Sequence, residues 1–213
     1  MGKTVLIHPT YFPNIAHFIV MHEADEIVFE VKDFFEKQTY RNRAYIHGAH
    51  GKQLLTVPVR HAKSLSKKTS DQAEIVNDRN WLRHHWKSIE TAYRTSPYFE
   101  FYEDDLLPFF HKKYEKLVDL NIQSISLIFN LLGWEKKVRF TEEYIKSPSG
   151  MLDFRYLVDA KKDHDYIKKL EPYTQVFSDR NGFIPDLSFL DLLFMEGPAS
   201  VEYLKKHKNL MVP

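Results

Sequence analysis

The sequence predicts an α/β fold, with an N-terminal βαβ unit, a partly parallel sheet and a hairpin, followed by a mainly helical C-terminal half. Two β-rich apolar runs flank a helical stripe within the roughly 30 residues that a βαβ unit needs. Segments joined through glycines then favour a hairpin, and from Asn80 apolar residues recur at helical spacing. The 213 residues suit one domain at 1–213, with an α/β part at 1–79 that carries the candidate site and a mainly helical part at 80–213 packed on it.

The βαβ unit is predicted from the first residues of the chain. Thr4 to Ile7 is a short apolar run that Pro9 stops, which is typical of a buried strand. Asn14 is a suitable N-cap for a helix. That helix has an apolar stripe of Ile15, Phe18, Ile19 and His22. A second strand is predicted at 27–31, and because a helix connects the two strands within about 30 residues, they are expected to be parallel.

The next segments predict a loop and a hairpin. Residues 34–43 are polar, basic and aromatic, which indicates a loop. Strands are predicted at 43–47 and 53–59, joined through Gly48 and Gly51.

Helices are predicted for most of the remaining chain. Asn80 can cap a helix that places Trp81, His85, Ile89 and Tyr93 on one face. A long helix is predicted to open at Asp104 or Asp105 and to end at Gly133. Asp186 can cap a helix over 187–195, and a final short helix is predicted to end near residue 207.

Composition excludes several classes of protein and site. The net charge of +1 gives no sign of a nucleic-acid partner. The absence of cysteine excludes disulfides, thiolate zinc sites and a cysteine nucleophile, and favours a reducing, cytoplasmic location. No run approaches the length of a membrane span. The sequence alone identifies no metal site, no cofactor and no oligomeric state.

The loop at residues 8–13 is predicted to form one wall of a small-molecule site. His8 and Tyr11 lie where a strand ends and a helix begins, and ligands bind at the carboxyl ends of parallel strands. The helix N-terminus nearby suits a phosphate or carboxylate, and His8 can move a proton. The alternative is structural: His8 caps the strand and Tyr11 packs in the core.

A second candidate group lies in the predicted loop. Lys37, Arg41 and Arg43 offer cations for an anionic ligand, and Asn42 offers an amide. On an extended chain Arg41 and Arg43 point one way and Asn42 the other. The alternative is a solvated run of charge.

The helix after Asn80 and the basic loop at 60–68 complete the candidates. Trp81 and His85 share one helix face, where His85 is either a site residue or a histidine satisfied within the core. The cationic loop at 60–68 is either a phosphate-binding lid or a solvated loop.

Taken together, several runs resemble the WbqC-like protein family. They are IHPTYFP, VFEVKDFFEKQTYRNR, LLTVPV, WLRHHWKSIETAYRTSPYFEFY and GFIPDLSFLDLLFMEGP, spread over nearly the whole chain. The family commonly opens with Gln-Pro-x-Tyr-x-Pro, and here His8 stands in the position of the Gln.

The resemblance implies a transferase of bacterial surface polysaccharide biosynthesis, in O-antigen gene clusters, that transfers a glycyl or other aminoacyl group to a sugar. Its partner would be a phosphate-bearing small molecule, such as a sugar nucleotide or an activated acyl donor. In this hypothesis Lys37, Arg41 and Arg43 hold the anion, and His8 or His85 moves the proton. Tyr11, Asn42 and Trp81 would bind and orient the substrate. The alternative hypothesis is a non-catalytic ligand-binding or accessory protein of polysaccharide assembly.

Overall fold

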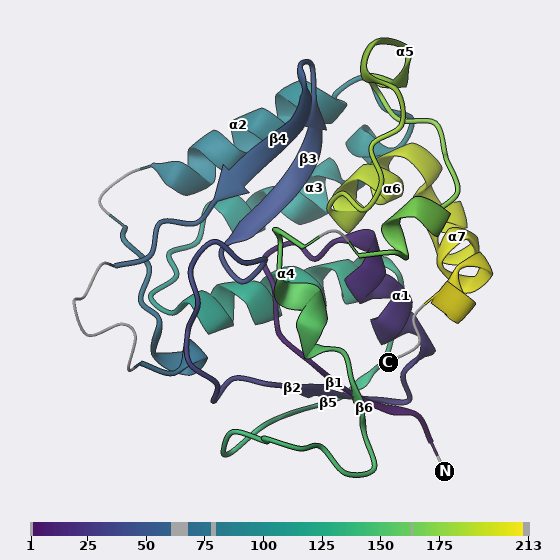
Figure 1. Ribbon diagram of the computed structural model, residues 1–213. Helices are drawn as coiled ribbons and strands as arrows, with labels where there is room; N and C mark the ends of the chain where they lie inside the picture. The colour runs from purple at the N-terminus through teal and green to yellow at the C-terminus, as the bar shows by residue number, and fades with distance from the viewer. Residues whose placement is uncertain (1, 61–67, 78–79, 163, 211–213) are drawn as a thin grey trace.

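A parallel sheet forms the base of the molecule (Figure 1). The computed structural model describes residues 2–60, 68–77, 80–162 and 164–210. Strand β1 (Thr4–Ile7) pairs in parallel with β2 (Glu26–Phe29) on one side and with β6 (Leu152–Asp153) on the other. Strand β5 (Lys137–Phe140) extends the sheet beyond β2, again in parallel.

The predicted βαβ unit is confirmed. Helix α1 (Ile15–Glu23) connects β1 to β2, and the Asn14 side chain accepts a hydrogen bond from the backbone N–H of His17 at 3.1 Å. In the view of Figure 1 the helices lie on one side of the sheet, while the segment between β5 and β6 lies on the other.

The sequence did not predict β5 and β6. Both are short, and every residue of β5 is exposed, so neither has the buried apolar run by which a strand is recognised. Their contribution means that the sheet contains strands from both 1–79 and 80–213.

The predicted hairpin is also present, as β3 (Arg43–Gly48) paired with β4 (Gly51–Thr56). Helix α2 (Trp81–Tyr93) lies along this hairpin (Figure 1). The short η2 turn (Ser70–Gln72) precedes α2 in the chain and contacts α4.

The long helix expected from Asp104 to Gly133 is wrong, because the structure has two helices there. Helix α3 (Phe99–Phe110) ends before α4 (Leu117–Leu131) begins. The segment between them forms hydrogen bonds elsewhere: the Ile75 N–H donates to the Glu115 carbonyl, and the Leu117 N–H donates to the Ala73 carbonyl. These contacts remove the chain from the helical path that its apolar pattern favours.

The C-terminal elements correct the role of Asp186. The predicted helix is α6 (Phe189–Glu196), and its N-cap is Ser188. Asp186 is fully buried and instead accepts hydrogen bonds from the Ala16 N–H (2.9 Å), the Asn14 amide (2.7 Å) and the Tyr166 hydroxyl (3.2 Å). Burial raises the pKa of Asp186 to about 7.

Short helices complete the described chain. They are η3 (Arg155–Val158), η4 (Ile167–Lys169), α5 (Ser178–Asn181), η5 (Gly197–Ala199), α7 (Ser200–Lys206) and η6 (Lys208–Leu210). Within the described residues, no helix is both long and apolar enough to cross a bilayer.

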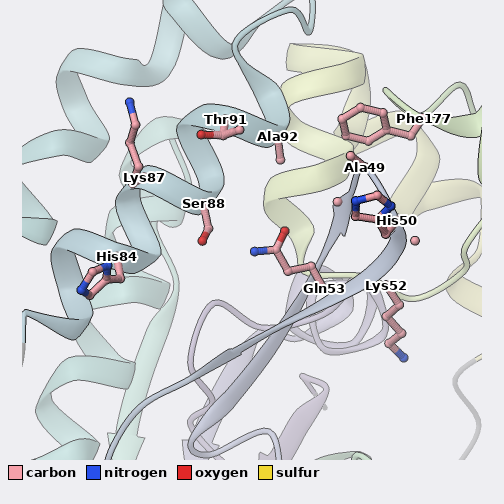
Figure 2. A pocket seen from close by; sticks show the side chains of 12 residues that line it. Ala49, His50, Lys52, Gln53, His84, Lys87, Ser88, Thr91, Ala92 and Phe177 are labelled. Carbon is pink, nitrogen blue, oxygen red and sulfur yellow. The ribbon is translucent and has the colours of Figure 1, made fainter.

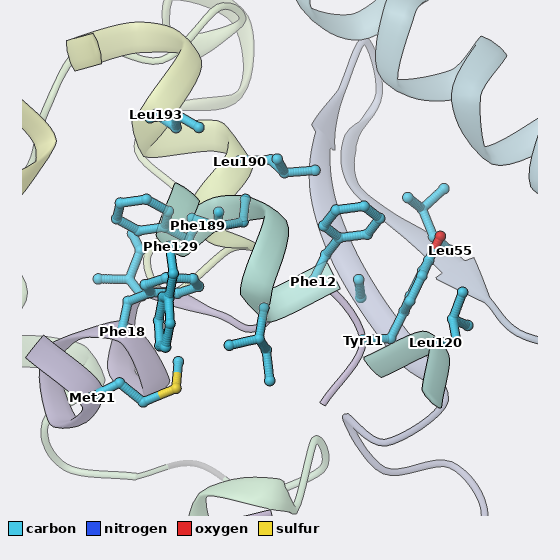
Figure 3. Close-up of a cluster of buried hydrophobic side chains, with 14 of the residues drawn as sticks. Tyr11, Phe12, Phe18, Met21, Leu55, Leu120, Phe129, Phe189, Leu190 and Leu193 are labelled. Atoms are coloured by element: carbon cyan, nitrogen blue, oxygen red, sulfur yellow. The ribbon is translucent and has the colours of Figure 1, made fainter. Parts of the chain in front are cut away.

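One continuous aromatic and aliphatic core joins the sheet to the helices (Figure 3). Phe18 of α1 stacks on Phe189 of α6, with ring centroids 4.1 Å apart. The Phe12 ring packs against Phe109 and Phe110 at the end of α3, with centroids 5.0 and 5.6 Å away, and Phe12 has a positive φ of 37°. A phenylalanine in this backbone region is strained, so the packing around it must hold the loop at 8–13 in place.

Candidate functional site

Polar side chains gather at one edge of the parallel sheet. His8 follows β1, Glu30 follows β2, and Asp153 and Arg155 lie at the end of β6 and just after it. Since these strands are parallel, their carboxyl ends meet at the same edge. Ligands of open α/β sheets bind at such an edge.

Glu30 ties the strand ends together from a fully buried position. Its carboxylate accepts hydrogen bonds from the Thr141 hydroxyl at 2.8 Å, the Lys32 backbone N–H at 2.9 Å and the Arg155 guanidinium at 3.3 Å. Thr141 follows β5 and Arg155 follows β6, so one carboxylate holds the ends of both outer strands to β2.

Asp33 and Arg41 form an ion pair beside His8, and the Arg41 side chain is buried. Ser70 donates its hydroxyl to the other Asp33 oxygen at 2.6 Å. Burial raises the pKa of Asp33, although the charge of Arg41 and the hydrogen bond from Ser70 oppose this rise. A carboxylate can accept about four hydrogen bonds, so Asp33 keeps acceptor capacity for a ligand.

His8 has a partner at each ring nitrogen. Its Nδ1 is 3.3 Å from the Glu30 backbone oxygen, and its Nε2 is 3.1 Å from Arg41 Nη2. A carbonyl only accepts and a guanidinium only donates, so the ring carries its proton on Nδ1 and accepts at Nε2. Burial and the charge of Arg41 lower the pKa of His8 well below its usual value. The imidazole is therefore neutral at pH 7, with its basic nitrogen turned to Arg41.

Arg155 holds the third side of this edge. It binds Asp153 through two hydrogen bonds, of 2.9 Å from Nε and 2.7 Å from Nη2. Its Nη1 donates to the Ile145 carbonyl at 2.6 Å, and its guanidinium lies 5.4 Å from the centroid of the Tyr144 ring. The hydrogen bonds with Asp153 raise the pKa of Arg155. Arg155 thus anchors the segment that carries Tyr144.

A cavity of about 660 Å³, which we call the edge pocket, opens at these groups. Its polar lining residues are His8, Lys32, Asp33, Glu36, Asp153 and Arg155. Its aromatic lining residues are Phe34, Tyr144 and Tyr156, which are 65%, 53% and 37% exposed. Each ring comes from the segment after a different strand, β2, β5 or β6. Large, solvent-exposed aromatic side chains around a cavity often indicate a ligand-binding site.

The edge pocket contains one of the two predicted catalytic histidines. His8 lines it, with the predicted binding residue Arg41 against it. His85 is instead buried in α2 and accepts a hydrogen bond at Nδ1 from the Tyr11 hydroxyl, at 3.0 Å. Burial lowers the pKa of His85 to about 4, and a hydrogen bond to the Thr56 backbone opposes this fall.

Tyr11, Trp81 and His85 form a separate cluster, which we call the buried clamp. The Trp81 ring packs edge-on against His85, with centroids 5.1 Å apart, and Tyr11 is fully buried. None of these three side chains lines the edge pocket.

The other predicted binding residues also lie outside the edge pocket. Lys37 is exposed, and Arg43 opens β3 in a half-buried position. Asn42 is buried, where its amide donates to the Val57 carbonyl and accepts from the Gln38 N–H. Their proposed contacts with a substrate stay predictions. Of the basic loop at 60–68, residues 61–67 lie outside the described part of the chain.

The sequence did not single out Asp33, Asp153 or Arg155. Asp33 lies only four residues after β2, but Asp153 and Arg155 come from a strand of two residues far along the chain. The signal that could have identified them is a charged residue near the carboxyl end of a parallel strand, and for Asp153 and Arg155 it can be used only once β6 is known.

A larger recess of about 840 Å³ lies between the hairpin tip and α2 (Figure 2). Gln53 and Ser88 face the gap between these elements, and exposed side chains such as His84, Lys87 and Thr91 make up much of its lining. The buried charges converge at the edge pocket instead, so we take that pocket as the candidate site. Within the described residues, no three His, Asp or Glu side chains are grouped as metal ligands would be.

Comparisons with known proteins agree with the resemblance seen in the sequence. The model of the WbqC-like protein family matches residues 8–168, which begin directly after β1 and include β2 to β6 and every residue that lines the edge pocket. The chain is 25% identical over 239 aligned positions to the uncharacterized protein Rv1507c of Mycobacterium tuberculosis, covering 96% of this chain and 98% of that protein. No solved structure matches significantly. The chain therefore belongs to the WbqC-like protein family.

Proposed function

We propose that the edge pocket binds a sugar and that the protein is a cytoplasmic transferase of bacterial surface polysaccharide biosynthesis. The observation that carries this proposal is the set of exposed rings, Phe34, Tyr144 and Tyr156, around ionisable groups at the carboxyl edge of a parallel sheet.

A sugar suits the two kinds of surface in this pocket. Aromatic faces can cover the apolar C–H face of a pyranose ring, since they provide large, rigid contact areas. The carboxylates of Asp33 and Asp153 can accept hydrogen bonds from sugar hydroxyls, and Arg155 can donate them. The cavity is of the size that usually holds a small molecule.

The reaction class follows from the family resemblance, which implies transfer of a glycyl or other aminoacyl group to the sugar. A phosphate of a sugar nucleotide or an activated donor would have to compete with Asp71 and Asp153 for Lys32 and Arg155, the cations in the lining. Asp33 can accept the proton of the attacking group, because burial raises its pKa and its remaining acceptor positions are available to a ligand.

The second candidate function is a non-catalytic sugar-binding or accessory protein of polysaccharide assembly. The occupied nitrogens of His8 favour it, because a histidine that donates to a carbonyl and accepts from Arg41 has no nitrogen ready for proton transfer.

Both candidate functions require the edge pocket to bind a sugar, and binding measurements test this requirement. Thermal shift and isothermal titration with UDP-sugars and the corresponding free monosaccharides should detect a ligand, and Phe34→Ala should weaken its binding about tenfold or more. Phe101→Ala is the matched control, since Phe101 is a phenylalanine of similar exposure outside the pocket. If no sugar binds, or if both variants bind equally well, the proposed site is wrong.

A product assay separates the two candidates. Mass spectrometry of a bound sugar incubated with activated aminoacyl donors should detect the acylated sugar if the protein is a transferase. Asp33→Asn should abolish this product while sugar binding persists. A sugar that binds tightly but is never modified would favour the accessory function.

A further inference from the structure

The charge balance of the edge pocket points to the kind of sugar. Three carboxylates line it, those of Asp33, Glu36 and Asp153, against the two cations Lys32 and Arg155. Since His8 is neutral, the lining carries one net negative charge. A ligand portion with several negative charges would be repelled, whereas a positive group would be attracted.

Both cations of the lining are already engaged. Lys32 Nζ lies 2.9 Å from an Asp71 oxygen. Arg155 has its two hydrogen bonds to Asp153 and a third to the Ile145 carbonyl. An anionic group would have to compete with these partners for the same donors.

The carboxylate of Glu36 is differently placed. It is exposed at the pocket, where its charge acts on Arg41 but forms no salt bridge with the described residues. Its exposed oxygens can therefore meet a cationic ligand group at the pocket.

The aromatic rings favour the same kind of group. The face of an aromatic ring attracts cations, and several such rings around a pocket can bind an ammonium group. This pocket already contains one example, because the Arg155 guanidinium lies over the Tyr144 ring. Phe34 and Tyr156 add two further exposed rings to the same lining.

We infer that the edge pocket takes a sugar with a free, protonated amino group, held between the Glu36 carboxylate and the exposed rings. This inference rests on the proposed sugar-binding function and narrows its substrate class to amino sugars. It also places the phosphate-bearing part of any donor outside the centre of the pocket.

The test compares three probes of nearly the same shape: D-glucosamine, N-acetyl-D-glucosamine and D-glucose. Isothermal titration is carried out at a pH where the amine of glucosamine is protonated. Glucosamine should bind about tenfold or more tightly than the other two, because only it carries the positive charge. Fluorine NMR of protein labelled with 3-fluorotyrosine should report the binding at Tyr144 and Tyr156.

Two variants locate the source of the preference. Glu36→Gln should reduce the preference for glucosamine over glucose about fivefold or more, since it removes the charge and keeps the shape. Glu143→Gln is the matched control, because Glu143 is an exposed glutamate in the segment of Tyr144 but does not line the pocket. It should leave the preference unchanged.

The outcomes distinguish this inference from the proposed function. Equal binding of glucose and glucosamine, lost in Phe34→Ala, would overturn the amino-sugar inference and leave sugar binding intact. A preference that survives Glu36→Gln unchanged would also overturn it. Absence of any sugar binding to the wild-type protein would overturn both.

Discussion

The edge pocket and the buried clamp have similar residues but opposite surroundings. Each contains a histidine of lowered pKa whose two nitrogens are both partnered. At His8 these partners lie beside a cavity with exposed aromatic rings. At His85 they are Tyr11 and Thr56, within the core. The difference shows that the residue type alone does not distinguish a site histidine from a core histidine. The presence of a cavity beside the side chain does.

The largest expected effect concerns Asp186, a buried carboxylate whose hydrogen-bond donors in the described part of the chain are all uncharged. Its pKa is about 7 in the folded protein and 3.8 is the ordinary value, so the folded state binds more protons between these pH values. The contribution of Asp186 to stability should therefore be greatest at the acid end and fall as pH rises through 7, by about 3 kcal/mol between pH 5 and pH 8. Burial lowers the pKa of His8, His17 and His85, so these groups act in the opposite direction.

Urea unfolding at pH 5 and pH 8 measures this effect. Relative to the wild-type protein, Asp186→Asn should gain about 3 kcal/mol of stability between pH 5 and pH 8, since the amide does not titrate and the buried histidines contribute equally to both proteins. If the wild-type protein and the variant show the same pH dependence of the free energy of unfolding, the pKa of Asp186 is not raised by burial.

A smaller effect is expected at the buried clamp. His85→Ala should lower the free energy of unfolding by about 2 kcal/mol, because it leaves a cavity and two polar groups unpaired. Its neighbour His84 is exposed, and His84→Ala should change stability by less than about 0.5 kcal/mol. Sugar binding should be unchanged in both variants that fold. If folded His85→Ala protein loses sugar binding, the edge pocket and the buried clamp act as one site.

The smallest expected effect on stability lies in the edge pocket. Tyr156→Ala should cost about 1 kcal/mol or less, because the ring is partly exposed and makes few core contacts. Its sugar affinity should nevertheless fall severalfold, measured by the same titrations. A large loss of stability without loss of binding would assign Tyr156 to the core.

The sequence predicted those elements whose signals are local. The strand at Thr4 to Ile7 and the cap at Asn14 depend on neighbouring residues, and both are present. The rule that ligands meet the carboxyl ends of parallel strands correctly placed His8 at that edge.

The remaining features depend on contacts between distant parts of the chain. The break between α3 and α4 follows from hydrogen bonds to residues 73–75. Arg155 reaches Glu30 across 125 positions. The sequence pattern of His85 is the same in a core and in a site, and only the Tyr11 and Thr56 contacts distinguish them.

The hydrogen bond from Ala16 to Asp186 has a consequence for how the chain acquires its fold during synthesis. The carboxylate that completes the first helix is made 170 residues after that helix begins to form its contacts. The Phe189 N–H likewise donates to the Pro13 carbonyl, next to the same helix start. During synthesis the N-terminal segment therefore cannot form its last hydrogen bonds until residues 186 and 189 have been made. We expect a chain released before residue 186 to bind chaperones and to fail to refold to the native state.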